Sequence, residues 1–249
     1  ALLGRCRDLA EQYGVPLVIH LAESKSEVEE IWKKYGKTPV NHMENLGLLS
    51  PNLIACHCVW LTEAEMNLVA HRGVKVVHNP ESNMKLASGV APVPELLAKG
   101  VTVGLGTDGC ASNNNLDLFQ EMDSAAKLHK VHRLDPTVMP SNVVLQMATL
   151  GGAKVLGLEK EIGSLEVGKK ADIIILDLNR PHLQPVYNIV SHLVYSATGA
   201  DVRDVIIDGK LVMHNRKILT LEEEKILFKA FEWKQKITAG SGKNHIGKL

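Results

Sequence analysis

The sequence has few of the features that mark secreted or disulfide-rich proteins. Its 249 residues include only four cysteines. Cys56 and Cys58 are separated by one residue at the end of a predicted strand, and we expect neither a shared metal ion nor a disulfide bridge between them. The amino-terminal ALLGRCRDLA lacks the apolar core of a signal peptide. We therefore expect no disulfide framework and a cytoplasmic location.

Long apolar runs and an excess of charge are also missing. No apolar run approaches the roughly 18–20 residues that cross a bilayer. The formal net charge is zero, with 28 basic and 28 acidic residues. This balance gives no support to a nucleic-acid or anionic-membrane partner. The glycine pair Gly104-x-Gly106 is followed by Thr107 and Asp108, and an acidic side chain there is the wrong chemistry for pyrophosphate, which argues against a dinucleotide site. The chain begins at Ala1, inside a helical pattern and without Met, so we expect it to be a fragment of a longer protein.

Short apolar runs alternate with amphipathic helices through the first half of the chain. The expected strands are nearly continuous apolar segments, as in sheets covered on both faces, and they span residues 15–20, 53–57, 74–78 and 101–108. Helices between them carry two candidate capping boxes, Ser26 with Glu29 and Thr62 with Glu65. The alternation predicts a parallel α/β sheet. Two further strands, 170–177 and 204–212, the latter with an Asp208-Gly209 hairpin turn, precede a helix at about 221–236.

Each of the four strands in the first half ends on a polar side chain. These residues are His20, His57, His78 and Asp108. A single histidine of this kind is more often a packed core residue, and a single aspartate is more often a turn or cap residue. Their shared position favours function, because chemistry collects beyond the carboxyl ends of parallel strands. The other histidines, His129 among them, lack this context and are interpreted as surface or structural residues.

The strand-end residues suit a catalytic metal site. His20 and Asp108 offer the imidazole and carboxylate ligands that Zn²⁺ or Fe²⁺ accepts. Glu23, just past the first strand, could act as a general acid and base and contact the substrate. His57 could polarise the attacked group or orient water. Asp108 could also accept a proton from that water.

Four segments resemble the second half of the metal-dependent amidohydrolase superfamily. They are VIHLAES, ACHCVWLTEAE, VVHNPESNMKLASG and VGLGTDGCASNNNLDLFQEM. The resemblance is strongest to the branch that contains 5-methylthioadenosine/S-adenosylhomocysteine deaminase and the triazine chlorohydrolases. It implies the second half of a (β/α)8 TIM barrel, with about four parallel strands and their helices, followed by a small β-rich appendage. The expected parts are a partial barrel at 1–160, a β-rich portion at 161–219, a helix at 220–237 and a flexible tail at 238–249.

The resemblance also implies a reaction. One divalent ion, zinc or iron, would be held by His20 and Asp108, with Glu23 moving protons and His57 beside the water or the leaving group. Water activated by the metal would attack C6 of an adenosine-type thioether and release ammonia. The partner would therefore be a small purine nucleoside-like substrate, with no nucleic acid and no membrane.

One element of the family pattern is missing from this sequence. The family has a His-x-His pair on its first barrel strand, and no His-x-His occurs here. We therefore expect the parent protein to be an enzyme and this chain alone to be inactive. Its open sheet edges would pair with a missing amino-terminal half or with another copy. Two alternatives stay open: a guanine, cytosine or triazine hydrolase, and a non-catalytic fragment or assembly module.

Overall fold

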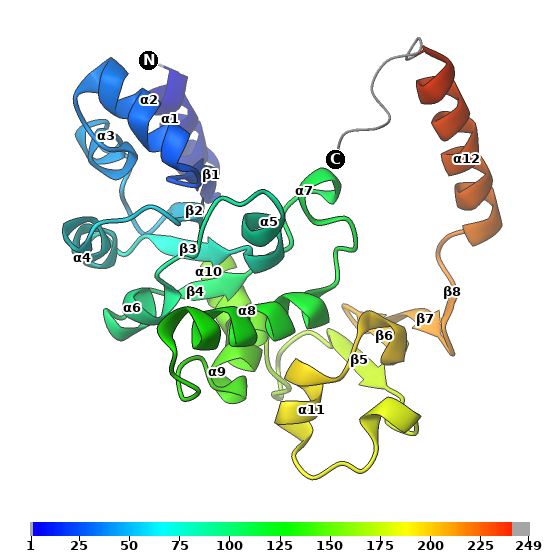
Figure 1. Cartoon of the computed structure of the whole chain (residues 1–249). Coiled ribbons are helices and arrows are strands. Elements are labelled where there is room, and N and C mark those ends of the chain that lie inside the picture. The colour runs from blue at the N-terminus through cyan, green and yellow to red at the C-terminus, as the bar shows by residue number, and fades with distance from the viewer. Residues whose placement is uncertain (1, 241–249) are drawn as a thin grey trace. The chain divides into compact units, whose positions relative to one another are not determined.

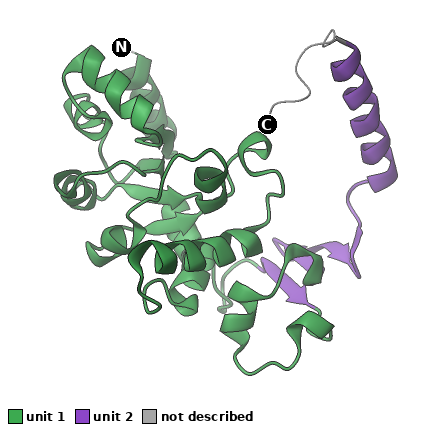
Figure 2. Cartoon of the chain, in the orientation of Figure 1, with its two compact units in different colours: residues 1–170, 177–201 green, residues 171–176, 202–249 purple. Residues whose placement is uncertain are grey.

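The structure is a computed structural model that describes residues 2–240 (Figure 1). The chain divides into two units, one from residues 1–170 and 177–201 and the other from residues 171–176 and 202–249 (Figure 2). The first unit contains all the strand-end residues singled out above. The described part of the chain has no helix long and apolar enough to cross a bilayer.

The first unit is built on a parallel sheet with the strand order β1-β2-β3-β4. The strands are β1 Leu17–Leu21, β2 Leu53–His57, β3 Lys75–His78 and β4 Val103–Leu105. The expected parallel α/β sheet is therefore confirmed. Pairing places His20 opposite Cys56 and His78 opposite Leu105, so the carboxyl ends of all the strands lie on the same side of the sheet.

Helices follow and separate these strands (Figure 1). They are α1 Leu2–Tyr13, α2 Lys25–Tyr35, α3 Pro39–Asn45, α4 Glu63–His71, α5 Pro80–Lys85, α6 Val93–Ala98, α7 Cys110–Asn113, α8 Leu118–Arg133, α9 Ser141–Gln146, a π-helical turn Met147–Gly151, α10 Gly152–Leu156 and α11 Ile189–Tyr195. Buried aliphatic residues from both kinds of element form the core, among them Ile54, Val76 and Leu96. Burial of this apolar surface is the main force that holds the helices on the sheet.

One of the two predicted capping boxes is correct. At the start of α4, the Thr62 side chain accepts from Glu65 N–H, and the Glu65 carboxylate accepts from Thr62 N–H. The box predicted at Ser26 and Glu29 is wrong, because the N-cap of α2 lies two residues earlier. Its N-cap is Ser24, which accepts from Glu27 N–H at 3.2 Å.

The Glu27 carboxylate explains the earlier start of α2. Its two oxygens accept from Ala22 N–H at 2.8 Å and from Glu23 N–H at 2.7 Å. The sequence Ser24-x-x-Glu27 thus serves both the helix and the loop that leaves β1. The same contacts fix the backbone of Glu23.

Close backbone packing explains a glycine in β4. A Cβ atom at Gly104 would lie 3.1 Å from the Cα of Gly152 at the start of α10. Because both positions lack side chains, the helix approaches the strand closely. Strand β4 ends at Leu105, so Asp108 lies in the loop that follows the carboxyl end of the strand.

The segment 177–201 belongs to the first unit through its contacts with helices. Helix α11 packs against α8 and α9. The Asp117 side chain caps α8 by accepting from Phe119 N–H, and its other oxygen accepts from Gly199 N–H at 2.8 Å. One carboxylate therefore joins two segments that are far apart in the sequence.

The second unit is an antiparallel sheet with a terminal helix (Figure 2). Its elements are β5 Ile173–Leu176, β6 Val202–Ile207, β7 Lys210–His214, β8 Lys217–Ile218 and α12 Glu223–Gly240. The predicted hairpin is confirmed: Asp208 and Gly209 join β6 to β7 with φ angles of 49° and 74°. Helix α12 includes the first residues of the tail expected at 238–249, and residues 241–249 lie outside the described part.

Candidate metal centre

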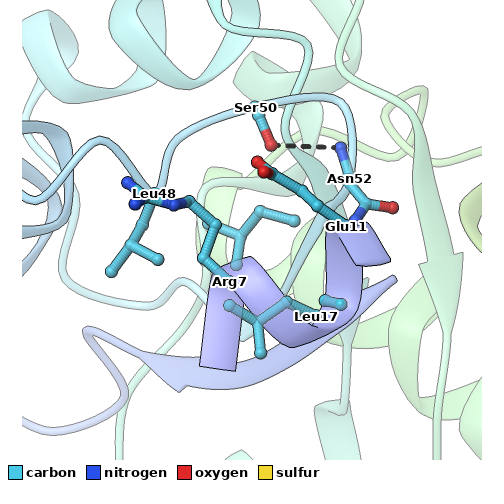
Figure 3. A pocket seen from close by; sticks show the side chains of 8 residues that line it. Arg7, Glu11, Leu17, Leu48, Ser50 and Asn52 are labelled. Atoms are coloured by element: carbon cyan, nitrogen blue, oxygen red, sulfur yellow. Dashed lines mark hydrogen bonds between the residues drawn. The ribbon is translucent and has the colours of Figure 1, made fainter. Parts of the chain in front are cut away.

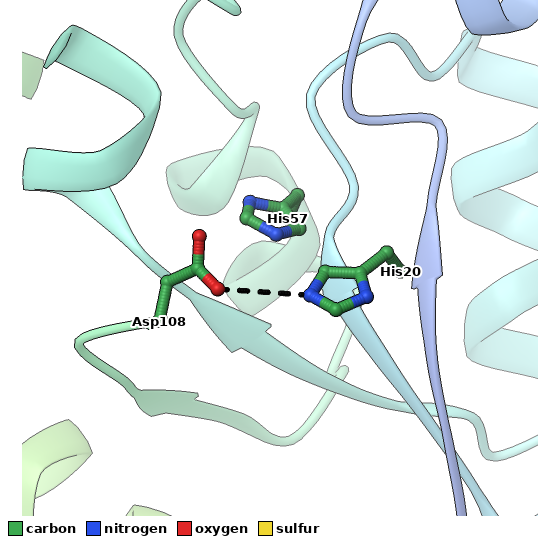
Figure 4. Close-up of side chains that lie close together, drawn as sticks. All are labelled: His20, His57 and Asp108. Carbon is green, nitrogen blue, oxygen red and sulfur yellow. Dashed lines mark ion pairs between the residues drawn. The ribbon is translucent and has the colours of Figure 1, made fainter. Parts of the chain in front are cut away.

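Three of the predicted residues meet at the carboxyl ends of the strands (Figure 4). His20 lies in β1, His57 ends β2, and Asp108 follows β4. One ligand atom from each lies within 4.8 Å of the other two. His20 Nε2 is 3.7 Å from Asp108 Oδ1, and the His20 and His57 rings stack with centroids 5.0 Å apart. Two imidazoles and a carboxylate form a donor set that suits Zn²⁺ or Fe²⁺.

The backbone turns sharply where these side chains are presented. Ala22, His57 and Asp108 have φ angles of 51°, 71° and 61°, in the left-handed region. Non-glycine residues adopt this region rarely and at a cost of order 1–3 kcal/mol, so the surrounding fold must impose it. Such conformations cluster at functional sites, which agrees with the convergence of donors here.

Asp108 is held as a carboxylate with one oxygen directed at His20. The hydroxyls of Ser82 and Ser112 both donate to its Oδ2, each at 2.7 Å, while Oδ1 faces His20. Burial alone would raise the pKa of Asp108, but these two hydrogen bonds and one from the Gly109 backbone lower it to about 2. Asp108 is therefore ionised, as a ligand must be.

His57 presents one ring nitrogen toward the site. Its Nδ1 is 2.8 Å from Asn83 Oδ1, and because an amide oxygen only accepts, Nδ1 carries the proton. Nε2 is then a lone-pair donor. It is buried and has no hydrogen-bond partner among the described residues. A buried polar atom of this kind needs an explanation, and a bound ion or water supplies one.

Glu23 lies beside His57 and is fixed from two sides. Its Oε2 is 3.8 Å from His57 Nε2, and its Oε1 accepts from the Ser88 hydroxyl at 3.2 Å. The side chain is about one quarter exposed. Glu23 therefore borders the cluster of donors and also reaches solvent, as a group that exchanges protons requires.

Residues that contact the site from neighbouring loops were missed in the sequence. They are Ser82, Asn83, Ser88 and Ser112. Three of them lie in the segment VVHNPESNMKLASG and the fourth lies in VGLGTDGCASNNNLDLFQEM, two of the segments that carry the family resemblance. Their residue types alone gave no signal, since serine and asparagine are common in loops.

His78 ends β3 but does not join this cluster. It is fully buried, and its Nε2 lies 3.2 Å from Nε2 of His129 on α8, which is also fully buried. Burial, with smaller effects of His129 and His57, lowers the pKa of His78 well below its usual value. The pair is therefore neutral and part of the core, in agreement with the structural interpretation of His129.

Cys56 in β2 and Cys58, just past its end, are free cysteines near the candidate site. Burial, with a smaller effect of Asp108, raises the pKa of Cys56 to about 11. Burial also raises the pKa of Cys58, which is fully buried. Burial therefore favours the protonated thiol at both positions. The expectation that the two do not share a metal ion stays a prediction.

A pocket lies at the opposite ends of the strands (Figure 3). Leu17 and Leu53, the first residues of β1 and β2, contribute to its wall. Its complete lining is Arg7, Ala10, Glu11, Leu17, Leu48, Ser50, Asn52 and Leu53. None of these residues belongs to the donor cluster, so we assign the pocket no part in the chemistry.

Comparison with known proteins agrees with this geometry. The chain is 58% identical over 227 residues to a 5-methylthioadenosine/S-adenosylhomocysteine deaminase of Syntrophobacter fumaroxidans, covering 91% of this chain and 52% of the relative. It is 50% identical over 228 residues to a 5′-deoxyadenosine deaminase of Methanosarcina acetivorans, covering 92% and 52%. The chain thus spans about half the length of these relatives.

The chain is also similar in fold to solved structures that contain zinc. An adenosine deaminase from Xanthomonas campestris with bound zinc superposes with a TM-score of 0.92 at 42% identity, covering 95% of this chain and 54% of that one. The zinc complex of atrazine chlorohydrolase from Arthrobacter aurescens superposes with a TM-score of 0.84 at 28% identity, covering 90% and 50%. A sequence model of the Amidohydrolase family matches residues 1–212, and the chain therefore belongs to the amidohydrolase family.

Proposed function

We propose that this chain forms the carboxyl-terminal half of a (β/α)8 barrel in a metal-dependent deaminase of adenosine-type thioethers. The observation that carries the proposal is the convergence of His20, His57 and Asp108 within 4.8 Å at the strand ends. The identity of 58% to a 5-methylthioadenosine/S-adenosylhomocysteine deaminase supports the substrate class. The sheet order β1-β2-β3-β4 and the coverage of about half of each relative are consistent with half a barrel.

His20 and Asp108 would hold one zinc or iron ion. The ionised Asp108 and the unpartnered, buried Nε2 of His57 fit such an ion. When bound, the ion supplies Lewis acidity that makes water nucleophilic near neutral pH. His57 Nε2 faces the same space, either to orient that water or to contact the leaving group.

Glu23 would move the proton in this reaction. In hydrolytic deamination the water oxygen bonds to C6, the bond from C6 to the amino nitrogen breaks, and a proton passes from water to the departing nitrogen. The Glu23 oxygen nearest His57, Oε2, would accept that proton and return it to the amino group as ammonia leaves. The hydrogen bond from Ser88 keeps the carboxylate directed at the site.

The open edges of the sheet make the isolated chain incomplete in this proposal. Strands β1 and β4 are its two edges, and Val18 of β1 is 57% exposed. Unpaired edge strands associate with other strands. We propose that a segment supplying the remaining ligands pairs with them, and that the isolated chain binds metal weakly.

Expression of the complete reading frame that encodes this chain tests the proposal. Zinc content and ammonia release should be measured with 5-methylthioadenosine, S-adenosylhomocysteine and 5′-deoxyadenosine, and with guanine, cytosine and atrazine as competing substrates. We expect about one zinc per chain and turnover of the adenosine-type compounds. Turnover of only the competing substrates would instead support the alternative hydrolase. A metal-free oligomer without turnover would support an assembly module.

A further inference from the structure

A buried carboxylate on α8 ties together the two loops that hold Asp108. Glu121 is fully buried. Its Oε2 accepts from the backbone N–H of Glu81 on α5 at 3.1 Å, and its Oε1 accepts from the Asn113 side chain on α7 at 2.5 Å. One side chain thus contacts the beginning of α5 and the end of α7.

The residues next to these two contacts are the donors to Asp108. Ser82 follows Glu81 and Ser112 precedes Asn113, and both hydroxyls reach Asp108 Oδ2 at 2.7 Å. Two connections, which we call arms, therefore link Glu121 to the Asp108 carboxylate. One arm runs through Glu81 and the adjacent Ser82, and the other runs through Asn113 and the adjacent Ser112. Asp108 itself has a left-handed backbone, and these two hydroxyls are the side-chain donors to its carboxylate.

We infer that Glu121 is a positioning residue that holds Ser82 and Ser112 in place and, through them, directs Asp108 Oδ1 at the metal site. This inference rests on the proposed function, because it assigns Glu121 a role in the site that Asp108 completes.

Only a carboxylate satisfies both arms at this position. A carboxylate accepts at each oxygen, and both of its partners here are N–H donors. A glutamine has one accepting oxygen and one donating nitrogen, so in either orientation a donor would face a donor. Asn113 cannot turn its amide without loss, because its Oδ1 accepts from Leu116 N–H at 2.6 Å.

The position is also a costly place for a carboxylate. Burial is the main effect that raises the pKa of Glu121 to about 7, and the charges of Glu81 and Asp108 add to it, against the hydrogen bonds from Glu81 N–H and Asn113. Glu121 forms no ion pair with another described residue, and a buried charge without such a partner is costly. A role in arranging the site accounts for Glu121 better than a role in the core.

The test compares Glu121→Gln with a matched control in the protein from the complete reading frame. Glu65→Gln is the control, since Glu65 is also buried and accepts a backbone N–H, but it caps α4 and contacts no donor to Asp108. We expect Glu121→Gln to lower zinc affinity or kcat by about 10- to 100-fold with little change in KM, the usual effect of a lost outer partner of a ligand. Glu65→Gln should leave both unchanged.

A double-mutant cycle tests the route. In a Ser82→Ala/Ser112→Ala background, Glu121→Gln should have little further effect on zinc affinity, because the arms through which it acts are absent. An undiminished effect in that background, or equal losses in Glu121→Gln and Glu65→Gln, would overturn the inference.

Crystal structures separate this inference from the proposed function. In Glu121→Gln, at least one of the two hydroxyl contacts to Asp108 should lengthen beyond hydrogen-bond distance, whether or not the protein binds zinc or deaminates any substrate. Retention of both contacts would refute the role of Glu121. A wild-type protein without zinc or turnover would refute the proposed function and leave the geometric result to decide the role of Glu121.

Discussion

His57 and Asn83 share a buried hydrogen bond, with Nδ1 and Oδ1 2.8 Å apart. It fixes the imidazole proton on Nδ1 and leaves Nε2 to face Glu23. Asn83→Ala removes this constraint, and we expect kcat to fall by about 10- to 100-fold. Nitrogen NMR of the histidine rings should show one tautomer of His57 in the wild type and a mixture in the variant. Asn41→Ala, at an exposed position in α3, is the control. An unchanged tautomer would contradict the assignment.

Asp108→Asn should remove a ligand charge while it keeps the shape and the tolerance of a left-handed backbone. We expect turnover to fall by at least about 100-fold, together with loss of zinc, because the ionised oxygen that faces His20 is no longer present. Metal analysis and steady-state kinetics measure the two effects. Retention of more than a few per cent of activity with full zinc would count against the role of Asp108.

Glu23→Gln should separate proton transfer from metal binding. Glu23 is not one of the three donors that converge within 4.8 Å, so zinc content should stay nearly intact. The catalytic rate should fall by about 100- to 10,000-fold, the usual span for a general acid and base. Ser88→Ala, which removes the hydroxyl that donates to Glu23, should have a smaller effect in the same direction. Loss of zinc in Glu23→Gln would make Glu23 a structural residue.

The buried imidazole of His129 should make stability depend on pH. Burial, followed by the charges of His132, Arg133 and Lys130, lowers its pKa from 6.5 to about 4. The unfolded chain takes up the proton near pH 6.5 and the folded chain near pH 4. The stability that His129 contributes is therefore complete above about pH 6.5 and is lost as the pH falls toward 4.

Urea unfolding across this pH range measures the effect. His129→Gln should reduce the fall of the unfolding free energy with decreasing pH. His78, which is also buried and neutral, should account for a further part of that fall. His71, exposed at the end of α4 and not among the groups that shift the pKa of His129, provides the control variant, His71→Gln. An equal dependence of the unfolding free energy on pH in His129→Gln and in the wild type would show that His129 does not titrate between about pH 4 and pH 6.5.

Gly104→Ala should destabilise the contact between β4 and α10. The added Cβ would lie 3.1 Å from Gly152 Cα and 3.3 Å from Val155 Cγ2, so the helix must shift. Overpacking of this kind costs about 1–3 kcal/mol. Gly4→Ala, in α1 with no atom within 4 Å of the new Cβ, should instead stabilise by about 0.5–1 kcal/mol. Thermal or urea unfolding compares them, and equal shifts would contradict the packing argument.

Local patterns in the sequence predicted much of the fold. The strand at 53–57, the capping box at Thr62 and Glu65, and the turn at Asp208 and Gly209 each depend on residues close together in the chain. The N-cap of α2 was placed incorrectly because two serines compete for it. The contacts of the Glu27 carboxylate with the preceding loop decide between them, and a pattern of one serine and one glutamate does not include that loop.

The candidate site was predictable only in its outline. The positions of the strand ends predicted His20, His57 and Asp108, because the last residues of parallel strands lie on the same side of the sheet. The contacts of Ser82 and Asn83 with these residues span 26 positions in the chain, and no periodicity encodes them. The pairing of His78 with His129 spans 51 positions and separates His78 from the other strand-end residues.

The left-handed backbone at His57 and Asp108 affects how mutational scans of this protein should be interpreted. A replacement by valine or isoleucine there changes the side chain and also opposes the path of the main chain, so its loss of activity overstates what the original group contributes. Asparagine and glycine accept that path at little cost. Other substitutions at both positions should therefore be compared with the asparagine and glycine variants. If glycine is tolerated and alanine is not, the position is limited by its backbone conformation and not by the chemistry of its side chain.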